Sequence, residues 1–310
     1  MKRESINNSA LPLLKEWTVN VLNFLNHLIN GIHIGSIYAL VALGYNMVYG
    51  IVKLINFAHG DIIMAGAYVA FFSLDAGLSP FVSVLIAVFI CMVLGVVIEK
   101  VAYRPLRKSA KISLLITAIG ISLLLENIAQ KLFSATPKLF PKIISGGFYI
   151  GDRQISMTTV VTIIVSAVLM IGLTVFVKTT KAGKAMRAVS EDTEAAQMMG
   201  INVDNTISLT FAIGSGLAAV AAVLYCCSYP QVYPTMGALF GIKAFIAAVL
   251  GGIGSIPGAV VGGITIGIAE ALTKGYISSM WADAIVFSLL IITLLLKPAG
   301  IMGHKTVEKV

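Results

Sequence analysis

The chain is poor in charge and nearly without cysteine, and each shortage excludes a class of protein. Only 12% of the 310 residues are charged, whereas 58% are hydrophobic, and the mean hydropathy is +0.94. A water-soluble fold of this length cannot hide so much apolar surface from solvent. The three cysteines, Cys91, Cys226 and Cys227, lie in apolar stretches without the spacing of a metal site or a disulfide framework. We therefore predict no metal site and no cofactor, and we interpret the cysteines as small buried apolar side chains.

Sequence motifs for nucleotide hydrolysis and for common hydrolytic chemistry are also absent. The phosphate loop GxxxxGK[ST] does not occur, and the nearest basic glycine string, Lys181-Ala182-Gly183-Lys184, lacks the earlier glycine and the hydroxyl residue. The sequence contains neither an HExxH pair nor a GxSxG elbow. We predict that the chain has no catalytic residue, does not hydrolyse ATP and is not an enzyme.

Long apolar runs are what the sequence does contain. A membrane-spanning helix needs about 20 mainly apolar residues, so the chain has room for roughly eight to ten spans. Lipid offers no water to an open backbone, so these runs must be helical. The predicted fold class is all-α, a polytopic membrane protein in which some helices are broken. The eight candidate spans cover residues 21–49, 55–74, 80–103, 112–133, 157–177, 206–228, 242–272 and 281–297.

The expected organisation is a single transmembrane domain. It covers residues 19–297 and includes a polar loop at 178–205. A polar segment, 1–18, precedes the domain, and a short tail, 298–310, follows it. We predict that no separate soluble domain is present.

Basic residues gather in short connectors and indicate the orientation. A net charge of +8 alone could suggest a nucleic-acid partner, but the connectors at 104–111 and 178–187 carry much of it. We predict contact with membrane lipid and none with nucleic acid. Both connectors should face the cytoplasm, which places the N-terminus outside. Lys297, Lys305 and Lys309 would place the tail inside only if the 242–272 run enters the membrane and returns.

Two apolar runs are interrupted, one in each half of the chain, at residues 56–61 and 251–258. Freed backbone groups are tolerated in a membrane only where they line a cavity or are buried in protein, so paired interruptions point to a transport path. The alternative is a kink or a close helix contact, since glycine is common in membrane helices. The candidate path residues are Asn56, His59, Asp61, Gly252, Gly254 and Ser255.

The glycines that follow the second interruption have a separate interpretation. Gly258 and Gly262 are four residues apart, and Gly263 and Gly267 continue the series. Small residues at this spacing let two helix backbones approach closely. We expect a tight helix crossing there.

Several ionisable residues fall inside or at the ends of the runs. His59 and Asp61 are two residues apart and therefore do not share a helix face, so a hydrogen-bonding or path-lining role is favoured over catalysis. For Glu126, Lys243 and Glu270, pairing or burial at a subunit interface is favoured over substrate contact. Glu99 and Lys100 precede the first basic connector, so we expect their side chains to reach the membrane surface.

The polar loop 178–205 predicts a short helix outside the membrane. Ser190 is the expected N-cap, Glu191, Asp192 and Glu194 would fill the first turn, and Gly200 would end the helix. Ala195, Met198 and Met199 form a small apolar face that is too short to be stable in water without a partner. The alternative is a helix that simply rests on the membrane surface.

The string Glu194-Ala195-Ala196, followed three residues later by Gly200, resembles the EAA loop of bacterial ABC importer permeases. That pattern continues toward Ile-x-Leu-Pro, whereas the matching stretch here is Thr210-Phe211-Ala212-Ile213. A longer resemblance, to LivH-type permeases of high-affinity branched-chain amino acid importers, covers nearly the whole chain after residue 18. It is carried by the stretches 35–40, 44–50, 55–61, 186–202 and 249–259.

The resemblance implies a permease subunit that moves leucine, isoleucine or valine into a bacterial cell across the inner membrane. Its implied partners are a second related permease in a heterodimer, two ATP-binding cassette ATPases, and a periplasmic or lipid-anchored amino-acid-binding protein. Alternatives are an importer of the same class for urea or short amides, an autonomous ion-coupled carrier, and a membrane enzyme. The residues implied to couple to the ATPase are Ser190, Glu191, Asp192, Glu194, Ala195, Ala196, Met198, Met199 and Gly200.

Overall fold

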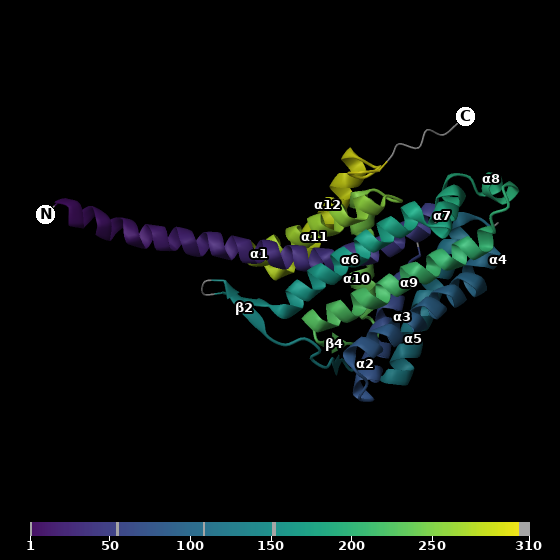
Figure 1. Ribbon diagram of the computed structural model, residues 1–310, viewed down its shortest axis with the longest axis horizontal. Coiled ribbons are helices and arrows are strands. Elements are labelled where there is room, and N and C mark those ends of the chain that lie inside the picture. Colours follow the sequence, from purple (N-terminus) through teal and green to yellow (C-terminus); the bar gives the residue numbers. More distant parts are fainter. Residues whose placement is uncertain (1, 54–55, 108, 151–152, 304–310) are drawn as a thin grey trace.

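Helices form wherever the sequence is apolar, because each helix satisfies its own backbone hydrogen bonds in lipid. The computed structural model describes residues 2–53, 56–107, 109–150 and 153–303, and the side chains of these residues other than 2–19, 150 and 153. The helices run mostly along one direction, and the first helix projects from one end of the bundle (Figure 1). The predicted all-α polytopic fold is confirmed.

The helices, in chain order, are α1 (Lys2–Val52), α2 (His59–Asp75), α3 (Pro80–Ile98), a π-helical turn η1 (Glu99–Tyr103), α4 (Arg104–Leu106), α5 (Lys111–Phe133), α6 (Met157–Thr179), α7 (Lys181–Glu191), α8 (Thr193–Met198), α9 (Val203–Ser228), α10 (Met236–Gly251), α11 (Ile256–Tyr276) and α12 (Ser279–Leu296). Two small antiparallel pairs join β1 (Lys138–Leu139) to β4 (Gln231–Val232) and β2 (Gly147–Ile150) to β3 (Arg153–Ser156).

Seven helices within the described ranges are long and apolar enough to cross a membrane: α1 from Asn20, α3 continued to Leu106, α5, α6, α9, α11 and α12. The apolar helix α10 is shorter, with 16 residues, and α2 has 17. Both of these shorter helices are largely buried in the bundle. The polar residues 2–18 continue α1 as helix, while residues 304–310 of the predicted tail, with Lys305 and Lys309, lie outside the described residues.

The two predicted interruptions are connections between helices rather than breaks inside one. Residues 56–58 lead into α2, which begins at His59, and Ile55 of the expected span lies outside the described residues. The 242–272 run is two helices, α10 and α11, separated by residues 252–255. The 242–272 run therefore enters the bundle as α10 and returns as α11. This is the arrangement that a tail facing the cytoplasm requires.

The core lies where α1, α9 and α10 meet. The membrane-length parts of α1 and α9 are mostly buried, whereas α5, α6 and α12 leave most of their apolar side chains partly or fully exposed. Exposed side chains of this kind include Ile116, Val168 and Leu295. An apolar outer surface of this kind suits lipid or another membrane subunit.

Glycines let α1 and α11 cross at close range, as the glycine series predicts. A β-carbon at Gly35 would lie 2.8 Å from the Gly263 carbonyl oxygen, and one at Gly263 would lie 2.6 Å from the Ala39 nitrogen. Gly267 faces the backbone of Gly31 and Gly35 in the same crossing. The expected tight crossing is confirmed, with α1 as the partner helix of Gly263 and Gly267 and α10 as the partner helix of Gly258 and Gly262.

Candidate coupling segment and transport path

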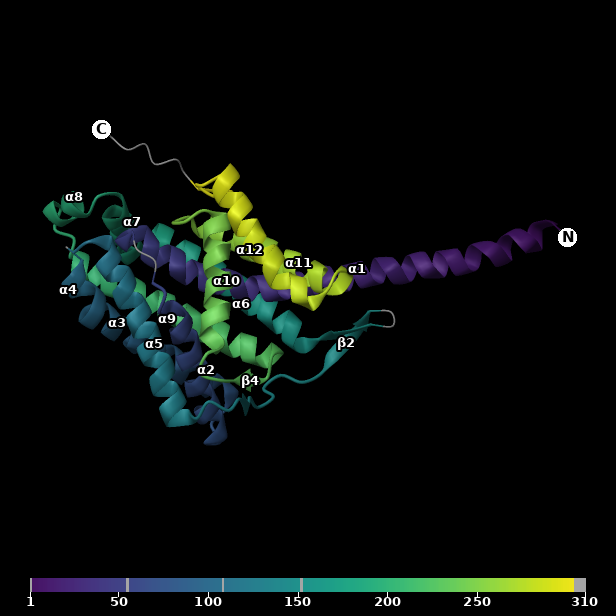
Figure 2. The ribbon, with the colours of Figure 1, turned by 180° about the vertical axis from the view of Figure 1, so that it is seen from behind.

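The two ends of the bundle carry different chemistry. Figures 1 and 2 place α4, α7 and α8 at one end, and the N-terminal part of α1 with the β2 hairpin at the other. Both predicted basic connectors lie at the α8 end, which we call the lower end. The described part of the tail joins them there, because Ile301 and Met302 donate backbone hydrogen bonds of 2.8 Å to Leu250 and Gly251.

The coupling segment begins with α7, an amphipathic helix that packs against the bundle. Thr180 caps it by accepting a 3.0 Å hydrogen bond from the Gly183 backbone. Gly183, Met186 and Val189 recur every third residue and form its buried face. A β-carbon at Gly183 would lie 2.5 Å from the Phe176 carbonyl oxygen, so α7 lies directly against the end of α6.

The helix α8 starts at Asp192, so the predicted cap at Ser190 is wrong. The Asp192 carboxylate accepts 2.9 Å hydrogen bonds from the backbone nitrogens of Glu194 and Ala195. Ser190 lies inside α7 and donates its hydroxyl to the Arg187 carbonyl, and Glu191 is the last residue of α7. The sequence places a second, better cap two residues later, and the extended backbone at Asp192 separates the two helices.

Gly200 ends α8, as predicted. Its φ of +82° is a conformation that glycine adopts at little cost, and its nitrogen donates to the Gln197 carbonyl. The Ile201 nitrogen donates to the Ala196 carbonyl, which completes the usual glycine-terminated helix end. Ala196 is the buried residue of α8 and anchors the helix to the bundle.

The rest of α8 is exposed. Met198 and Met199 have 88% and 83% of their surface accessible, and Glu194 and Ala195 are also exposed. Two adjacent methionines at the tip of a polar segment form an apolar, adaptable surface that none of the described residues covers.

A cavity of about 910 Å³ lies behind the coupling segment at the lower end. Its walls are the ends of α1 and α6, the α7 residues Arg187, Ser190 and Glu191, and the turn between α10 and α11 with Gly254 and Ser255. Residues predicted to couple to a partner and residues predicted to line a path therefore face the same cavity.

One turn of α1 contacts both connecting segments. The Asn46 side-chain nitrogen donates to the Ser255 carbonyl at 2.9 Å and to the Gly252 carbonyl at 3.4 Å. The neighbouring Tyr45 ring lies edge-on to His59 at 4.7 Å between centroids, and Gly44 leaves the room that this imidazole occupies. The turn of α1 at residues 44–46 links the two segments structurally.

A set of ion pairs fastens the start of α9 to the π-helical turn. Arg107 pairs with Glu99 and, at 2.6 Å, with Asp204, which also pairs with Arg104. Ser208 donates to the other Glu99 oxygen at 2.6 Å. Glu99 is fully buried, so the expectation that it reaches the membrane surface is wrong; Lys100, beside it, is exposed. Glu99 and Arg107 are eight positions apart in the sequence, and η1 and α4 lie between them.

A second charged cluster is buried among α1, α10, α11 and α12. Glu270 accepts hydrogen bonds from Lys243 at 3.0 Å, Lys274 at 2.6 Å and the Tyr38 hydroxyl at 2.7 Å. Lys243 also pairs with Asp283 at 2.6 Å. The pairing expected for Lys243 and Glu270 is confirmed, with each charge satisfied inside this chain.

Comparison with known proteins identifies the family. The family described as "Branched-chain amino acid transport system / permease component" matches residues 27–295. The chain belongs to this family.

Relatives resemble the permease over nearly its whole length. It is 43% identical over 304 residues, 94% of this chain and 99% of the relative, to the "High-affinity branched-chain amino acid transport system permease protein BraD" of Pseudomonas aeruginosa. It is 44% identical, over 93% of this chain and 98% of the relative, to the permease protein LivH of the same kind of system in Escherichia coli. A probable LivH of Methanocaldococcus jannaschii is 30% identical over 86% of this chain and 89% of its own.

The predicted residues of the permease fall into two groups. The residues predicted to couple to the ATPase lie together at the lower end, at the end of α7, in α8 and in the residues that flank α8. Among the predicted path residues, Gly254 and Ser255 line the lower cavity. Asn56, His59 and Asp61 are buried in the bundle instead, and Asn56 accepts a 2.7 Å hydrogen bond from the Tyr103 hydroxyl.

Proposed function

We propose that this permease is one of two membrane-spanning subunits of an ABC importer that moves leucine, isoleucine and valine into a bacterial cell. The names of its full-length relatives support the substrate class. The multi-pass apolar helices place it in a membrane, which we propose is the inner one. It catalyses no reaction itself.

The observation that carries the coupling role is the exposed tip of α8. An autonomous carrier does not require two uncovered methionines beside acidic residues at one end of a polar segment. An ATPase surface with an apolar cleft and a basic rim would fit Met198, Met199 and Glu194. Residues 190–200 would then transmit movement from two ATPase subunits to the bundle.

The lower cavity supplies the mechanical connection. Ser190 and Glu191 lie on one wall, and Gly254 and Ser255 on another, so a displacement of α7 changes the space next to the α10–α11 turn. We propose that the path runs beside this turn, and that Gly252 belongs to it. Asn56, His59 and Asp61 would support it from the other side of α1.

The assembly we propose includes two further kinds of partner besides the ATPase subunits. A second related permease would cover part of the exposed apolar surface in a heterodimer. A periplasmic or lipid-anchored binding protein would deliver the amino acid at the end opposite α8, which we call the upper end.

Reconstitution into liposomes tests this function. We expect leucine uptake only when the chain is combined with the second permease, both ATPases and the binding protein. ATP must also be present on the side of the membrane to which the ATPases are bound. Uptake of leucine by this chain alone, driven by a proton or sodium gradient, would instead establish the ion-coupled carrier. Uptake of urea or a short amide, but not leucine, by the complete assembly would change the substrate class.

A further inference from the structure

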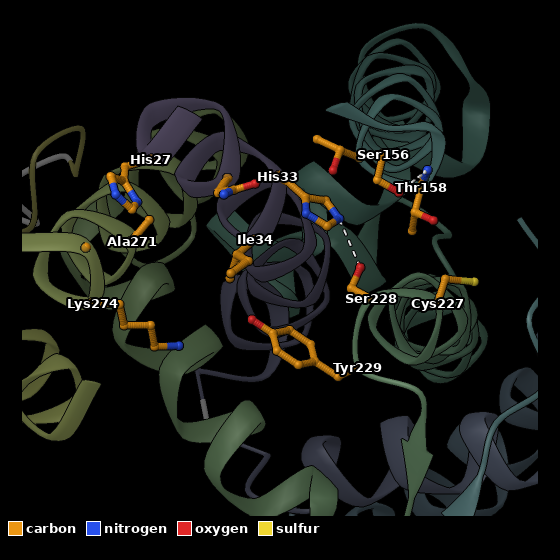
Figure 3. A pocket seen from close by; sticks show the side chains of 13 residues that line it. His27, His33, Ile34, Ser156, Thr158, Cys227, Ser228, Tyr229, Ala271 and Lys274 are labelled. Atoms are coloured by element: carbon orange, nitrogen blue, oxygen red, sulfur yellow. Dashed lines mark hydrogen bonds between the residues drawn. The ribbon is translucent and has the colours of Figure 1, made fainter. Parts of the chain in front are cut away.

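A second cavity, at the upper end, has a lining suited to an anion. Its volume is about 430 Å³, within the range of about 300–1,000 Å³ typical of small-molecule sites. It lies among α1, α6, α9 and α11 (Figure 3), at the start of α6, whereas α7 packs against the other end of that helix. We call it the upper pocket.

One wall of the upper pocket carries an ammonium group. Lys274, in the last turn of α11, lines the pocket and donates one hydrogen bond to Glu270. An ammonium has three donors, so this bond leaves others for a ligand. Glu270 also keeps Lys243 and Tyr38, so it does not depend on Lys274 alone. In Figure 3 the Lys274 amino group and the Tyr229 hydroxyl point toward one another.

Another wall carries the start of α6. Ser156 caps this 23-residue helix by accepting a hydrogen bond from the Thr158 nitrogen at 3.2 Å, and both residues line the pocket. The N-terminal end of a long helix favours negative charge. The helix end and the Lys274 ammonium face the same space from different elements, so two independent features attract an anion.

The remaining lining is polar but uncharged, or apolar. The His33 Nε2 atom and the Ser228 hydroxyl are 3.0 Å apart and fix one another, while Ile34 and Ala271 present aliphatic surface. Among the described residues, no carboxylate lines the pocket. A compact ligand with one negative group and an aliphatic part matches this arrangement.

We propose that the upper pocket binds the carboxylate of a small aliphatic amino acid, with Lys274 as its cationic partner, before the molecule enters the bundle. The identity of this ligand rests on the proposed transport function. The carboxylate would accept hydrogen bonds from Lys274 and from hydroxyls at the start of α6, and the side chain would lie toward Ile34. Lys274 is then a binding residue as well as a member of the buried charged cluster.

Cys227 provides a native reporter, because it lines the pocket and is partly exposed, whereas Cys91 and Cys226 are buried. The permease, with its partner permease, is placed in phosphatidylcholine nanodiscs, and alkylation of Cys227 is followed by peptide mass spectrometry. Leucine is compared with 4-methylpentanoate, which lacks the amino group, and with 3-methylbutylamine, which lacks the carboxylate. We expect leucine and 4-methylpentanoate to slow the alkylation and the amine to leave it unchanged.

Variants assign this protection to Lys274. In Lys274→Met the protecting concentration should rise about tenfold or more, and Lys274→Arg should retain protection because it keeps the positive charge. Lys142→Met removes an exposed lysine outside the pocket and should behave as the wild type. Equal protection by the amine, unchanged protection in Lys274→Met, or no protection by either carboxylate overturns the proposal.

Leucine uptake by the complete wild-type assembly separates the two proposals. An assembly that imports leucine while Cys227 stays unprotected overturns the pocket and leaves the transport function standing. An assembly in which both carboxylates protect Cys227 but leucine is not imported supports the pocket and overturns the transport function.

Discussion

Asp192 is the residue on which the exposed tip of the coupling segment depends. Its carboxylate satisfies two backbone nitrogens at the start of α8, and α8 is too short to hold its shape without such help. We expect Asp192→Ala to destabilise this turn by about 0.5–2 kcal/mol and to reduce ATP-driven leucine uptake. Asp192→Asn keeps the acceptor oxygen and is the matched control. Uptake by the reconstituted assembly is measured, and equal loss in both variants would show that the carboxylate's charge matters rather than the cap.

Glu270 is the centre of the buried charged cluster and should control the stability of the fold. Glu270→Gln removes the charge that Lys243 and Lys274 share, although Lys243 keeps Asp283. We expect a loss of about 3 kcal/mol in the free energy of unfolding, at the lower end of the cost of breaking a buried pair. Tyr38→Phe removes one hydrogen bond to the same carboxylate and should cost about 1–3 kcal/mol. Thermal unfolding in detergent checks both, and an unchanged midpoint in Glu270→Gln contradicts the pairing.

Single residues show where sequence reasoning succeeds and where it fails. Gly200 was predictable because its role is local: a glycine after an apolar, acidic turn ends a helix by its own backbone freedom. The choice between Ser190 and Asp192 was not, since both are good caps and the decision depends on how far α7 packs against α6. Glu99 was misread for a similar reason, because its partners, Ser208 and Arg107, come together only through the fold.

The crossing of α1 and α11 depends on glycine as a spacer. A methyl group at Gly263 would meet the Ala39 backbone, whereas one at Gly172 on α6 would meet no described atom within 4 Å apart from the nearby backbone of α6 itself. We expect Gly263→Ala to separate the helices and to cost about 1–3 kcal/mol, as overpacking does. Gly172→Ala should leave stability unchanged or slightly higher, because alanine favours helix. Thermal unfolding of the two variants is the measurement, and equal stability would show that the crossing tolerates a wider spacing.

The α10–α11 turn shows a limit of reading elements from apolar runs. Residues 242–272 are continuously apolar apart from glycine, one proline and a few polar residues, so hydropathy cannot tell a broken span from two helices. The deciding interactions are distant in sequence: Asn46 holds the carbonyls of Gly252 and Ser255, and residues 301–302 pair with the end of α10. Composition determines that these residues are helical and in the membrane, whereas tertiary contacts determine where the chain turns.

The arrangement of the whole bundle makes its sidedness testable with two exposed positions. Met198 lies at the tip of α8, and Tyr149 lies in the β2 hairpin at the upper end, where 70% of its surface is accessible. The basic connectors predict that α8 faces the cytoplasm. In a Cys227→Ser background, which removes the partly exposed native thiol, an impermeant thiol reagent should label Tyr149→Cys in intact spheroplasts and Met198→Cys only in inverted vesicles.

The same experiment also tests docking, because a partner that covers α8 must shield it. Co-expression of the ATPase subunits should slow the labelling of Met198→Cys in inverted vesicles and leave Tyr149→Cys in spheroplasts unaffected, since only the lower end would be covered. Lys181→Cys, exposed at the start of α7, is a useful third position that reports how far the covered surface extends. Labelling of Met198→Cys from outside the cell would show that the orientation is the reverse of the predicted one. If the ATPases do not alter the labelling, α8 does not have the coupling role, and the family to which the chain belongs is unaffected.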